Sequence, residues 1–337
     1  MPAGFPSGPP SGFIDRRALL ARLAVVMGAA GAGAPAVAEA PAGAPAPASL
    51  RPDDPLPLDA VAEGVFVFRA PYELLAPGNQ GAIANMTLIV GTEAAAVIDT
   101  GNSFIAGARM RAAVKAVTDR PVRYVINTHM HPDHTLGNAA FVAPGVQFVA
   151  HRKMPRALSV RADTYMAQAE RLLGPGAEGT RLIIPDHLVD DRLMLDLGGR
   201  ALELRAHPTA HTDNDLTVRD TATDTWVMGD LLFIGHVPTL DGSVSGWLGL
   251  LDALSGEPAR RAVPGHGPAS AAWAAGADDE RRYLARLRAD VQALIDSGGS
   301  MSAAPQAAAQ GERGNWALFD EFNPRNAIAA FHELEWQ

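Results

Sequence analysis

The chain has 337 residues, enough for one large domain or two ordinary ones, and its 47 % apolar content allows a sizeable core. Cysteine is absent, which excludes disulfides and thiolate ligands, so any zinc must be held by His, Asp or Glu. The net charge is −9; residues 1–38 hold three Arg and one Asp, which leaves 25 basic and 36 acidic residues and a net charge of −11 on the rest. Because no basic stripe is visible, nucleic acid is not expected as a partner.

The N-terminal segment, residues 1–38, has the features of a twin-arginine export signal. Arg16-Arg17 precedes a short apolar run at 23–34, and residues 36–38 form a small-x-small cleavage candidate. The apolar run is shorter than the ~20 residues that cross a bilayer, so no permanent membrane anchor is expected. We therefore expect a periplasmic protein; a disordered tail or an anchor are the alternative interpretations.

Residues 39–55 are rich in Pro and Ala and are predicted to be a linker, so the folded part is expected to begin near Leu56. Apolar and β-branched patterns predict strands, in chain order, at 61–69, 86–90, 95–99, 122–127, 146–150, 193–197, 201–204, 216–219, 226–228 and 262–263. Helical patterns predict helices at 103–117, 153–173, 246–254, 278–295 and 323–336.

Strands alternate with helices, and two pairs of strands form hairpins. This organisation predicts a layered α/β fold with mixed sheets rather than a purely parallel one. We assign residues 56–300 to a catalytic domain and 301–337 to a C-terminal helical extension that packs on it.

The segment from Thr128 to His134 carries three His and one Asp directly after an apolar strand. Because Pro132 prevents the strand from continuing, the cluster is expected in a loop at the strand's C-terminal end. His129 and His131, two residues apart, leave the strand on the same side and can converge on one ion, while Asp133 and His134 can face a second ion. Neutral imidazoles and carboxylates are natural zinc ligands.

Three further fragments each follow a predicted strand. They place His211 in Ala-His-Thr-Asp, Asp230 after Met-Gly and His266 between two glycines. Strand-to-loop junctions are where open α/β sheets place their sites. The glycines next to Asp230 and His266 permit tight backbone turns.

The pattern His-x-His-x-Asp-His, then a distant His, then Gly-Asp and Gly-His-Gly, resembles the metallo-β-lactamase superfamily over roughly 56–268. The resemblance implies an αββα sandwich of two mixed sheets flanked by helices, with a metal site at one edge. It also implies the following ligands: His129, His131 and His211 for the first ion, Asp133, His134 and His266 for the second, and Asp230 as a bridge. Asp99 matches a recurrent family Asp and would orient a ligand His. The β-lactamase subclass that uses Cys at the position of Asp230 is excluded.

A narrower resemblance is to the quinoprotein relay system zinc metallohydrolases. It depends on the twin arginine, the segment 79–85, Gly246-Trp247-Leu248 and the ending Phe331 to Trp336. This resemblance implies a link to a PQQ-dependent dehydrogenase system, with a quinoprotein dehydrogenase as a partner, and not a particular substrate.

The other histidines are weighed against the ligand set. His151 and His332 are expected to be structural, and His187 to lie in a surface loop. His207 is four residues before His211, but the Thr and acidic residues after His211 match the family motif better. His236 could contact substrate, and a solvated loop His is an equal alternative.

Together these features predict an exported hydrolase with two Zn²⁺ ions per chain, iron or manganese being alternatives. A hydroxide bridging the ions would attack a carbonyl of a small ester, lactone, thioester or β-lactam, with Asp133 as the catalytic residue that orients the water or takes its proton.

Three rival functions remain. The first is an iron enzyme. Flavo-diiron proteins carry Glu where His131 stands and need a flavodoxin domain that this sequence does not show, whereas a mononuclear iron persulfide dioxygenase is not rejected by the motif. The second is a non-enzymatic periplasmic binding module that serves a quinoprotein dehydrogenase. The third is a nuclease, against which the acidic chain and the export signal argue.

Overall fold

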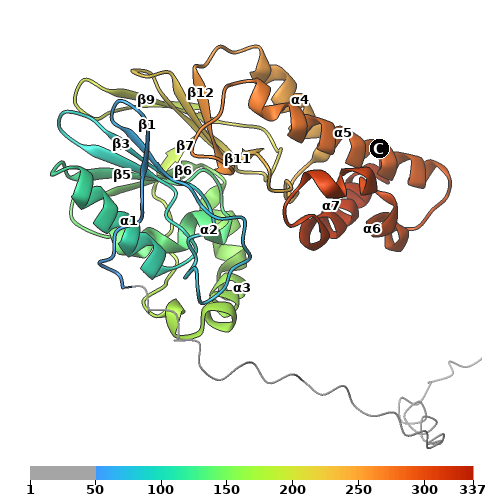
Figure 1. Cartoon of the computed structure of the whole chain (residues 1–337), viewed down its shortest axis with the longest axis horizontal. Helices are drawn as coiled ribbons and strands as arrows, with labels where there is room; N and C mark the ends of the chain where they lie inside the picture. Colours follow the sequence, from blue (N-terminus) through green and yellow to red (C-terminus); the bar gives the residue numbers. More distant parts are fainter. Residues whose placement is uncertain (1–50, 337) are drawn as a thin grey trace, which may run out of the picture. The chain divides into compact units, whose positions relative to one another are not determined.

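The computed structural model describes residues 51–336, so the predicted export signal and most of the predicted linker lie outside the described residues. Residues 51–336 form two mixed β-sheets that face each other, with helices on both outer faces (Figure 1). The mixed sheets agree with the strand pattern of the sequence, and the αββα layers agree with the family resemblance.

The larger sheet has seven strands that pair in chain order. They are β1 (Asp59–Ala62), β2 (Val65–Phe68), β3 (Met86–Val90), β4 (Ala95–Ile98), β5 (Val122–Ile126), β6 (Gln147–His151) and β7 (His187–Val189). The pairs from β1 to β4 are antiparallel, as in Leu88 opposite Val97, and those from β4 to β7 are parallel. The smaller sheet has the order β12 (Arg261–His266), β11 (Thr225–Phe233), β10 (Leu216–Asp220), β9 (Ala201–Ala206), β8 (Arg192–Asp196), and only β11 and β12 are parallel.

The helices lie outside this sandwich. They are α1 (Phe104–Val117), α2 (Pro132–Thr135), α3 (Met154–Leu173), α4 (Val244–Ser255), α5 (Asp278–Asp296), α6 (Ala304–Ala307) and α7 (Phe319–Leu334). No helix within residues 51–336 is both long and apolar enough to cross a membrane.

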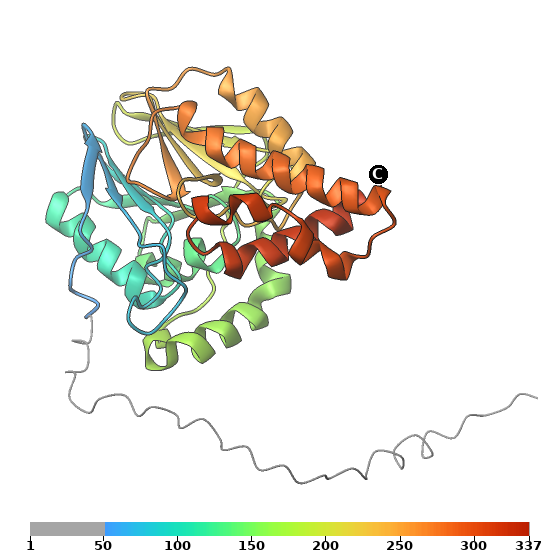
Figure 2. The ribbon, with the colours of Figure 1, turned by 45° about the vertical axis from the view of Figure 1, so that its right-hand side comes forward.

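Alternation along the strands sorts side chains into separate cores. Ile89 and Ile126 of the larger sheet meet Leu204 and Val218 of the smaller one in the central layer. The opposite face of the larger sheet packs on α1, and α3 packs beside it. The outer face of β11 and β12 packs on α4, α5 and α7, which run close together in Figure 2.

Helix α1 begins as predicted, because the Ser103 side chain caps it by accepting a hydrogen bond from the Ala106 N–H at 3.0 Å. Its Gly107 lies against the backbone of Gly137, where an added Cβ would be 2.2 Å from the Gly137 carbonyl oxygen. This close approach fixes the segment that follows the His-x-His-x-Asp-His motif against α1.

Several predictions about local structure were wrong. The strand predicted at 262–263 is longer, because β12 runs from Arg261 to His266 and includes His266. The single strand predicted at 61–69 is two strands, β1 and β2, because Gly64 takes a left-handed φ of 63° and turns the chain. The strand predicted to end at 228 continues to Phe233, so Asp230 lies inside β11 and not after it. His187 begins β7, where its Nδ1 lies 2.9 Å from Gln147 Oε1, and does not lie in a surface loop.

Candidate metal centre

The His-x-His-x-Asp-His segment leaves β5 and turns into α2, a single helical turn that begins at Pro132. Backbone groups of the segment are held by buried amides. Asn127 Nδ2 donates to the His134 carbonyl oxygen at 2.8 Å, and Asn138 Nδ2 donates to Asn127 Oδ1 at 2.7 Å. Because the backbone is fixed in this way, the side chains of His129, His131, Asp133 and His134 have defined directions.

The structure brings all seven predicted ligand residues together. Four of them follow β5, Asp230 and His266 come from β11 and β12, and His211 comes from the loop between β9 and β10. The seven residues form two groups that could each hold a metal ion, the first of His129, His131, His211 and Asp230 and the second of Asp133, His134 and His266, with the ligand atoms of each group within 4.8 Å of one another. The predicted convergence of side chains from distant parts of the sequence is therefore present.

Three imidazole nitrogens meet in the first group. His129 Nε2 lies 3.0 Å from His131 Nδ1, and His211 Nε2 lies 3.2 Å and 3.0 Å from those two atoms. Ligands about 2.0–2.1 Å from a tetrahedral zinc ion are roughly 3.3–3.4 Å from one another. The triangle of nitrogens is therefore slightly smaller than one face of a zinc tetrahedron.

The outer ring nitrogens determine which tautomers these imidazoles take. His211 Nδ1 donates to the Thr239 carbonyl oxygen at 2.7 Å, and His131 Nε2 donates to Asp241 Oδ2 at 3.1 Å. His129 Nδ1 faces Thr128 Oγ1 at 3.1 Å, and this hydroxyl gives its own proton to Asp99. All three inner nitrogens are thus left with lone pairs that point at one place, an arrangement that repels itself unless a cation lies between them.

In the second group, His134 Nε2 lies 3.8 Å from Asp133 Oδ2, and His266 Nε2 lies 3.3 Å from the same oxygen. His134 Nδ1 contacts Asp99 Oδ2 at 2.8 Å, so Nε2 is the nitrogen that faces the group. His134 Nε2 and Asp230 Oδ1 are both buried without a hydrogen-bond partner among the described residues. Buried polar atoms are rarely left unpaired, and metal coordination would satisfy both.

Asp230 lies between the two groups. Its Oδ1 is 3.2 Å from His134 Nε2, and its Oδ2 is 3.6 Å from His211 Nε2 and 3.5 Å from His266 Nε2. The bend that directs it inward is at Gly229, which has a φ of 57° and interrupts the register of β11 on β12. A single carboxylate therefore reaches both ligand groups.

The charge states follow from burial and from the carboxylates. Burial, with the charge of His131, lowers the pKa of His211 to about 3, and burial with the charge of His134 holds the pKa of His129 well below its usual value. Burial alone would also lower the pKa of His266, but Asp230 and Asp133 raise it to about 9. His129 and His211 thus offer neutral imidazoles, the form that binds metals.

The contact between Asp99 and the His134 ring is the one expected of a carboxylate that orients this ring. Asp99 also accepts hydrogen bonds from the Thr128 N–H at 2.9 Å and the Thr128 hydroxyl at 2.8 Å. Its φ of 60° is in the left-handed region, which Asp tolerates better than most residues. Strain of this kind persists where surrounding contacts over-determine the conformation.

Sequence reasoning missed the groups that orient His131 and His211. Asp241 and the Thr239 carbonyl both come from the loop between β11 and α4. The sequence places His236 in this loop, but no motif distinguishes Asp241 within it. A contact across 110 residues leaves no local spacing signal.

His236 is buried, so the alternative of a solvated loop residue was wrong. Its ring lies 4.9 Å from that of His266 and 5.4 Å from that of Phe322, and 6.1 Å from that of Tyr72. Nδ1 is engaged with the Val237 carbonyl oxygen at 2.7 Å. His236 is therefore part of an aromatic wall beside the second group.

On another side, α3 presents Arg161 and Tyr165 one turn apart. Arg161 Nη2 lies 3.8 Å from Asp241 Oδ2. Burial raises the pKa of the Tyr165 phenol, and the charges of Asp241 and Asp133 raise it further, so this hydroxyl is within electrostatic reach of the centre. No motif in the sequence distinguishes either residue.

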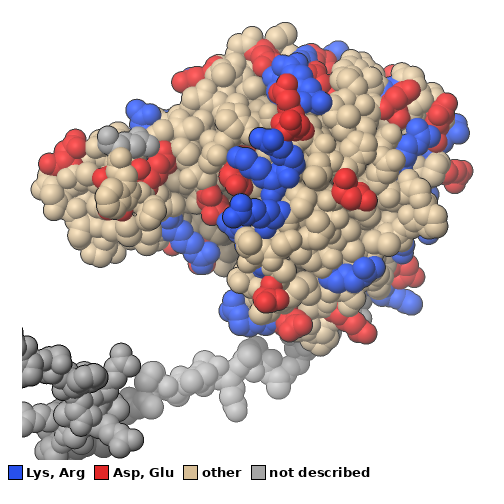
Figure 3. Space-filling view, turned by 180° about the vertical axis from the view of Figure 1, so that it is seen from behind, with Lys and Arg blue, Asp and Glu red and all other residues tan. Residues whose placement is uncertain are grey.

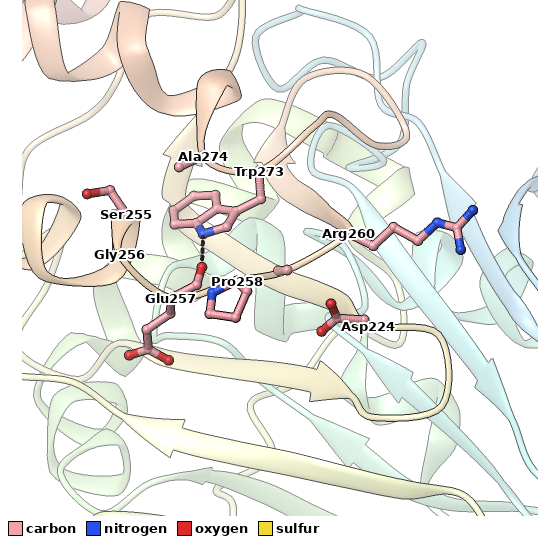
Figure 4. Close-up of a pocket in the computed structure, with 9 residues that line it drawn as sticks. Asp224, Ser255, Gly256, Glu257, Pro258, Arg260, Trp273 and Ala274 are labelled. Carbon is pink, nitrogen blue, oxygen red and sulfur yellow. Dashed lines mark hydrogen bonds between the residues drawn. The ribbon is translucent and has the colours of Figure 1, made fainter.

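A shallow pocket at the opposite ends of β11 and β12 contains none of the seven ligand residues (Figure 4). Trp273 forms its wall and donates from Nε1 to the Glu257 carbonyl oxygen at 3.1 Å. A second pocket lies beside the centre, between Tyr72 and the Gly267-Pro268 segment that follows His266.

The fold is similar to solved structures of two kinds. An inverting sec-alkylsulfatase from Pseudomonas sp. has a TM-score of 0.63 and 17% sequence identity, covering 82% of this chain and 50% of its own. A metallo-beta-lactamase from Pontibacter korlensis has a TM-score of 0.56 and 18% identity, covering 68% of this chain and 99% of its own. A linear primary-alkylsulfatase from Pseudomonas sp. (strain ATCC 19151) is 34% identical over 56 residues, which are 17% of this chain and 11% of that protein.

The chain thus spans about half the length of the alkylsulfatase structure and a smaller share of the linear alkylsulfatase. These similarities agree on the fold. The family model of the metallo-beta-lactamase superfamily matches residues 80–266 of this sequence. This segment runs from the loop before β3 to His266, the last of the seven ligand residues. On the ligand pattern, the two-sheet fold and this match, the chain belongs to the metallo-beta-lactamase superfamily.

Proposed function

We propose that this protein is a hydrolase that binds two zinc ions. His129, His131 and His211 would hold one ion, Asp133, His134 and His266 the other, and Asp230 would contact both. The observation that carries the proposal is the convergence of three imidazole nitrogens within 3.0–3.2 Å of one another. Iron and manganese share part of this ligand preference and are the alternative metals.

Bound zinc would supply Lewis acidity and lower the pKa of a water molecule to about 7, which makes a nucleophile available at neutral pH. The chain's own contribution is made by Asp133. Burial alone would raise the pKa of its carboxyl, but His134 and His266 hold it well below its usual value, so the group is ionised. Its side chain keeps 17% exposure, and it could therefore orient an attacking water or accept a proton from it.

The proposed substrates are small carbonyl compounds: esters, lactones, thioesters and β-lactams. Two similar proteins are named alkylsulfatases, so sulfate esters, which are not carbonyl compounds, are a second candidate class. The observation that favours an anionic substrate is the position of Arg161, a cation 3.8 Å from the Asp241 carboxylate at the side of the centre.

Nucleic acid is not among the proposed substrates. On the face shown in Figure 3, clusters of Lys and Arg are short and are bordered by Asp and Glu. A nuclease needs a continuous basic track along which the phosphate backbone can bind. The acidic net charge of the chain argues in the same direction.

Export by the twin-arginine route and action beside a quinoprotein dehydrogenase stay predictions from the N-terminal sequence and the narrower resemblance. Fractionation of cells that express the full chain would test the first. Co-purification with a dehydrogenase, combined with no hydrolysis of a broad substrate panel, would favour the role of a binding module.

The proposal is tested by elemental analysis of the purified protein followed by a hydrolysis screen. We expect two zinc ions per chain, hydrolysis of at least one substrate class, reversible loss of activity with a chelator and recovery with Zn²⁺. One iron per chain with oxygen consumption would contradict the proposal in favour of a persulfide dioxygenase. Full hydrolysis after verified metal removal would also contradict it.

Asp133→Ala supplies a sharper test. The variant should fold as the wild type does but lose turnover by about 10²-fold or more, because it removes both a ligand and the group that handles the proton. The matched control is Asp163→Ala, since Asp163 is exposed on α3 and away from the ligands. Circular dichroism and the rate on the best substrate of the screen would be compared for both variants.

A further inference from the structure

We infer that the C-terminal helix α7 positions two ligand residues of the metal centre through the loop 237–243. The inference rests on the proposed two-metal site and assigns a role to Asn326 and Glu333 within it. Glu333 belongs to the terminal motif Phe331 to Trp336, to which the fold and the ligand set alone give no function.

The loop is attached to the ligands directly. The Thr239 carbonyl oxygen accepts from His211 Nδ1 at 2.7 Å, and Asp241 Oδ2 accepts from His131 Nε2 at 3.1 Å. The Asp241 N–H also donates to the His211 carbonyl oxygen at 3.0 Å. Displacement of this loop would therefore rotate two of the three imidazoles of the first group.

Helix α7 is hydrogen-bonded to the centre of the loop 237–243. Asn326 Oδ1 accepts from the Leu240 N–H at 2.9 Å, and Asn326 Nδ2 donates to the Pro238 carbonyl oxygen at 2.6 Å. These two bonds flank Thr239, whose carbonyl orients His211. The Asn326 amide is buried and also donates to the Tyr283 hydroxyl at 2.8 Å, which anchors it to α5.

Glu333 holds the other end of the loop, where α4 begins. Its carboxylate accepts from the Ser243 hydroxyl at 2.8 Å, the Val244 N–H at 2.6 Å and the Ser245 N–H at 3.2 Å. A carboxylate at a helix N-terminus satisfies free N–H groups and favours the helix dipole. One side chain of α7 thus fixes the N-terminus of α4, 90 residues away in the sequence.

Helix α4 transmits this position to the same ligand. The Trp247 ring, one turn into α4, is fully buried and lies 5.2 Å from the His211 ring. On the other side of the loop, Gly242 is so close to Ala210 that an added Cβ would be 2.3 Å from the Ala210 carbonyl oxygen. His211 is therefore held through the loop and through α4, and α7 contacts both.

The test measures metal binding and not turnover alone. The full chain would be stripped of metal and titrated with Zn²⁺ against a chromophoric chelator, and then loaded with Co²⁺ for its visible spectrum. The variants are Glu333→Ala, Glu333→Gln and Asn326→Asp. The matched control is Glu321→Gln, which removes a carboxylate of α7 whose contact at 3.2 Å is with exposed Arg325.

We expect Glu333→Ala to raise the zinc dissociation constant of the first group by about 10-fold, the lower end of the about 10–100-fold seen for groups that orient ligands. Its cobalt spectrum should also shift. Glu333→Gln keeps one acceptor oxygen and should recover part of the affinity, Asn326→Asp should weaken zinc binding, and Glu321→Gln should match the wild type.

A purely structural role for α7 predicts a different result. Glu333→Ala would then lower the unfolding temperature of the metal-free protein and leave zinc affinity and the cobalt spectrum unchanged, which would overturn the inference. If Glu333→Ala does not fold, wild-type zinc affinity in both Glu333→Gln and Asn326→Asp overturns it equally. Absence of zinc binding by the wild type would refute the two-metal proposal itself, and the inference with it.

Discussion

Gly265 precedes the ligand His266 and lies against the carboxylate of Asp230. A Cβ added at this position would be 1.7 Å from Asp230 Oδ1 and 2.6 Å from the Gly229 carbonyl carbon. These neighbours are a buried carboxylate and the backbone of an adjacent strand, so neither can withdraw without moving β11. The requirement for glycine here comes from space and not from a left-handed φ.

We therefore expect Gly265→Ala to displace Asp230 and to reduce bound metal from two ions per chain to one or none, with a parallel loss of activity. Metal analysis after gel filtration would show this. The control is Gly249→Ala, because Gly249 is exposed in α4 with nothing within 4 Å of an added Cβ. That variant should keep its metal and gain up to about 1 kcal/mol of stability from helix propensity. Full metal content in Gly265→Ala would contradict the expectation.

At the same scale, the sequence identified the residues that meet at the centre and not those that orient them. His129 to His134 form a dense local pattern whose ligand types and spacing are informative without any structure. Asp241 and Glu333 act across 110 and 90 residues, respectively, and a single carboxylate in a loop or a helix has no distinguishing neighbours. Their roles become visible only when the chain is folded.

The hairpin of β8 and β9 is linked to the other sheet by Arg200. Its guanidinium donates to both carboxylate oxygens of Asp220, at 2.9 Å and 2.7 Å, and to the carbonyl oxygens of Val90 at 2.9 Å and Glu63 at 2.8 Å. Glu63 lies in the turn between β1 and β2, and Val90 is the last residue of β3. A planar guanidinium can bond four acceptors in this way, which a lysine cannot.

Loss of this link should therefore lower the free energy of unfolding. Arg200→Met leaves the fully buried Asp220 carboxylate without its cation and should lower the free energy of unfolding by about 3–5 kcal/mol. Urea denaturation would measure the change. Arg192→Met serves as control, since Arg192 pairs with Glu203 at the surface and such pairs contribute about 0–1 kcal/mol. Similar losses in the two variants would show that the link between the sheets does not stabilise the fold.

Among the elements, those with a strong local signal were predicted well. Helix α1 has its Ser103 cap, and the hairpin of β3 and β4 has its turn. The prediction for β11 ended too early because Gly229-Asp230 has the composition of a loop, yet pairing with β12 carries the strand through it to Phe233. Partner strands supply hydrogen bonds that override local preference, and the partners are not known from the sequence.

At the scale of the whole molecule, the C-terminal segment was predicted as an extension that packs on a catalytic domain. Trp316, Phe319 and Phe331 share one hydrophobic cluster with Tyr283 of α5 and Trp247 of α4. This cluster covers the outer face of β11 and β12, the two strands that carry Asp230 and His266. The C-terminal segment therefore shares one hydrophobic core with the strands that carry the site.

The histidines also make the stability of the whole molecule depend on pH, and His207 is the clearest case outside the ligand set. It is buried, and its Nε2 lies 2.8 Å from Thr217 Oγ1. Burial, with the nearby charge of Arg205, lowers the pKa of His207 to about 3, whereas the unfolded value is near 6.5. Between these values the unfolded chain binds a proton that the folded chain does not, so the free energy of unfolding falls as pH falls below about 6.5.

We expect His207→Gln to remove this contribution, which amounts to about 1.4 kcal/mol per pH unit between pH 6 and pH 4. Urea denaturation of wild type and variant, both in excess chelator, would give the two slopes of unfolding free energy against pH. Because the metal ligands titrate in both proteins, their effect cancels in the difference. A lower but parallel curve for the variant would mean that His207 titrates alike in the folded and unfolded chain, and the buried Thr217 contact would then not keep its ring neutral.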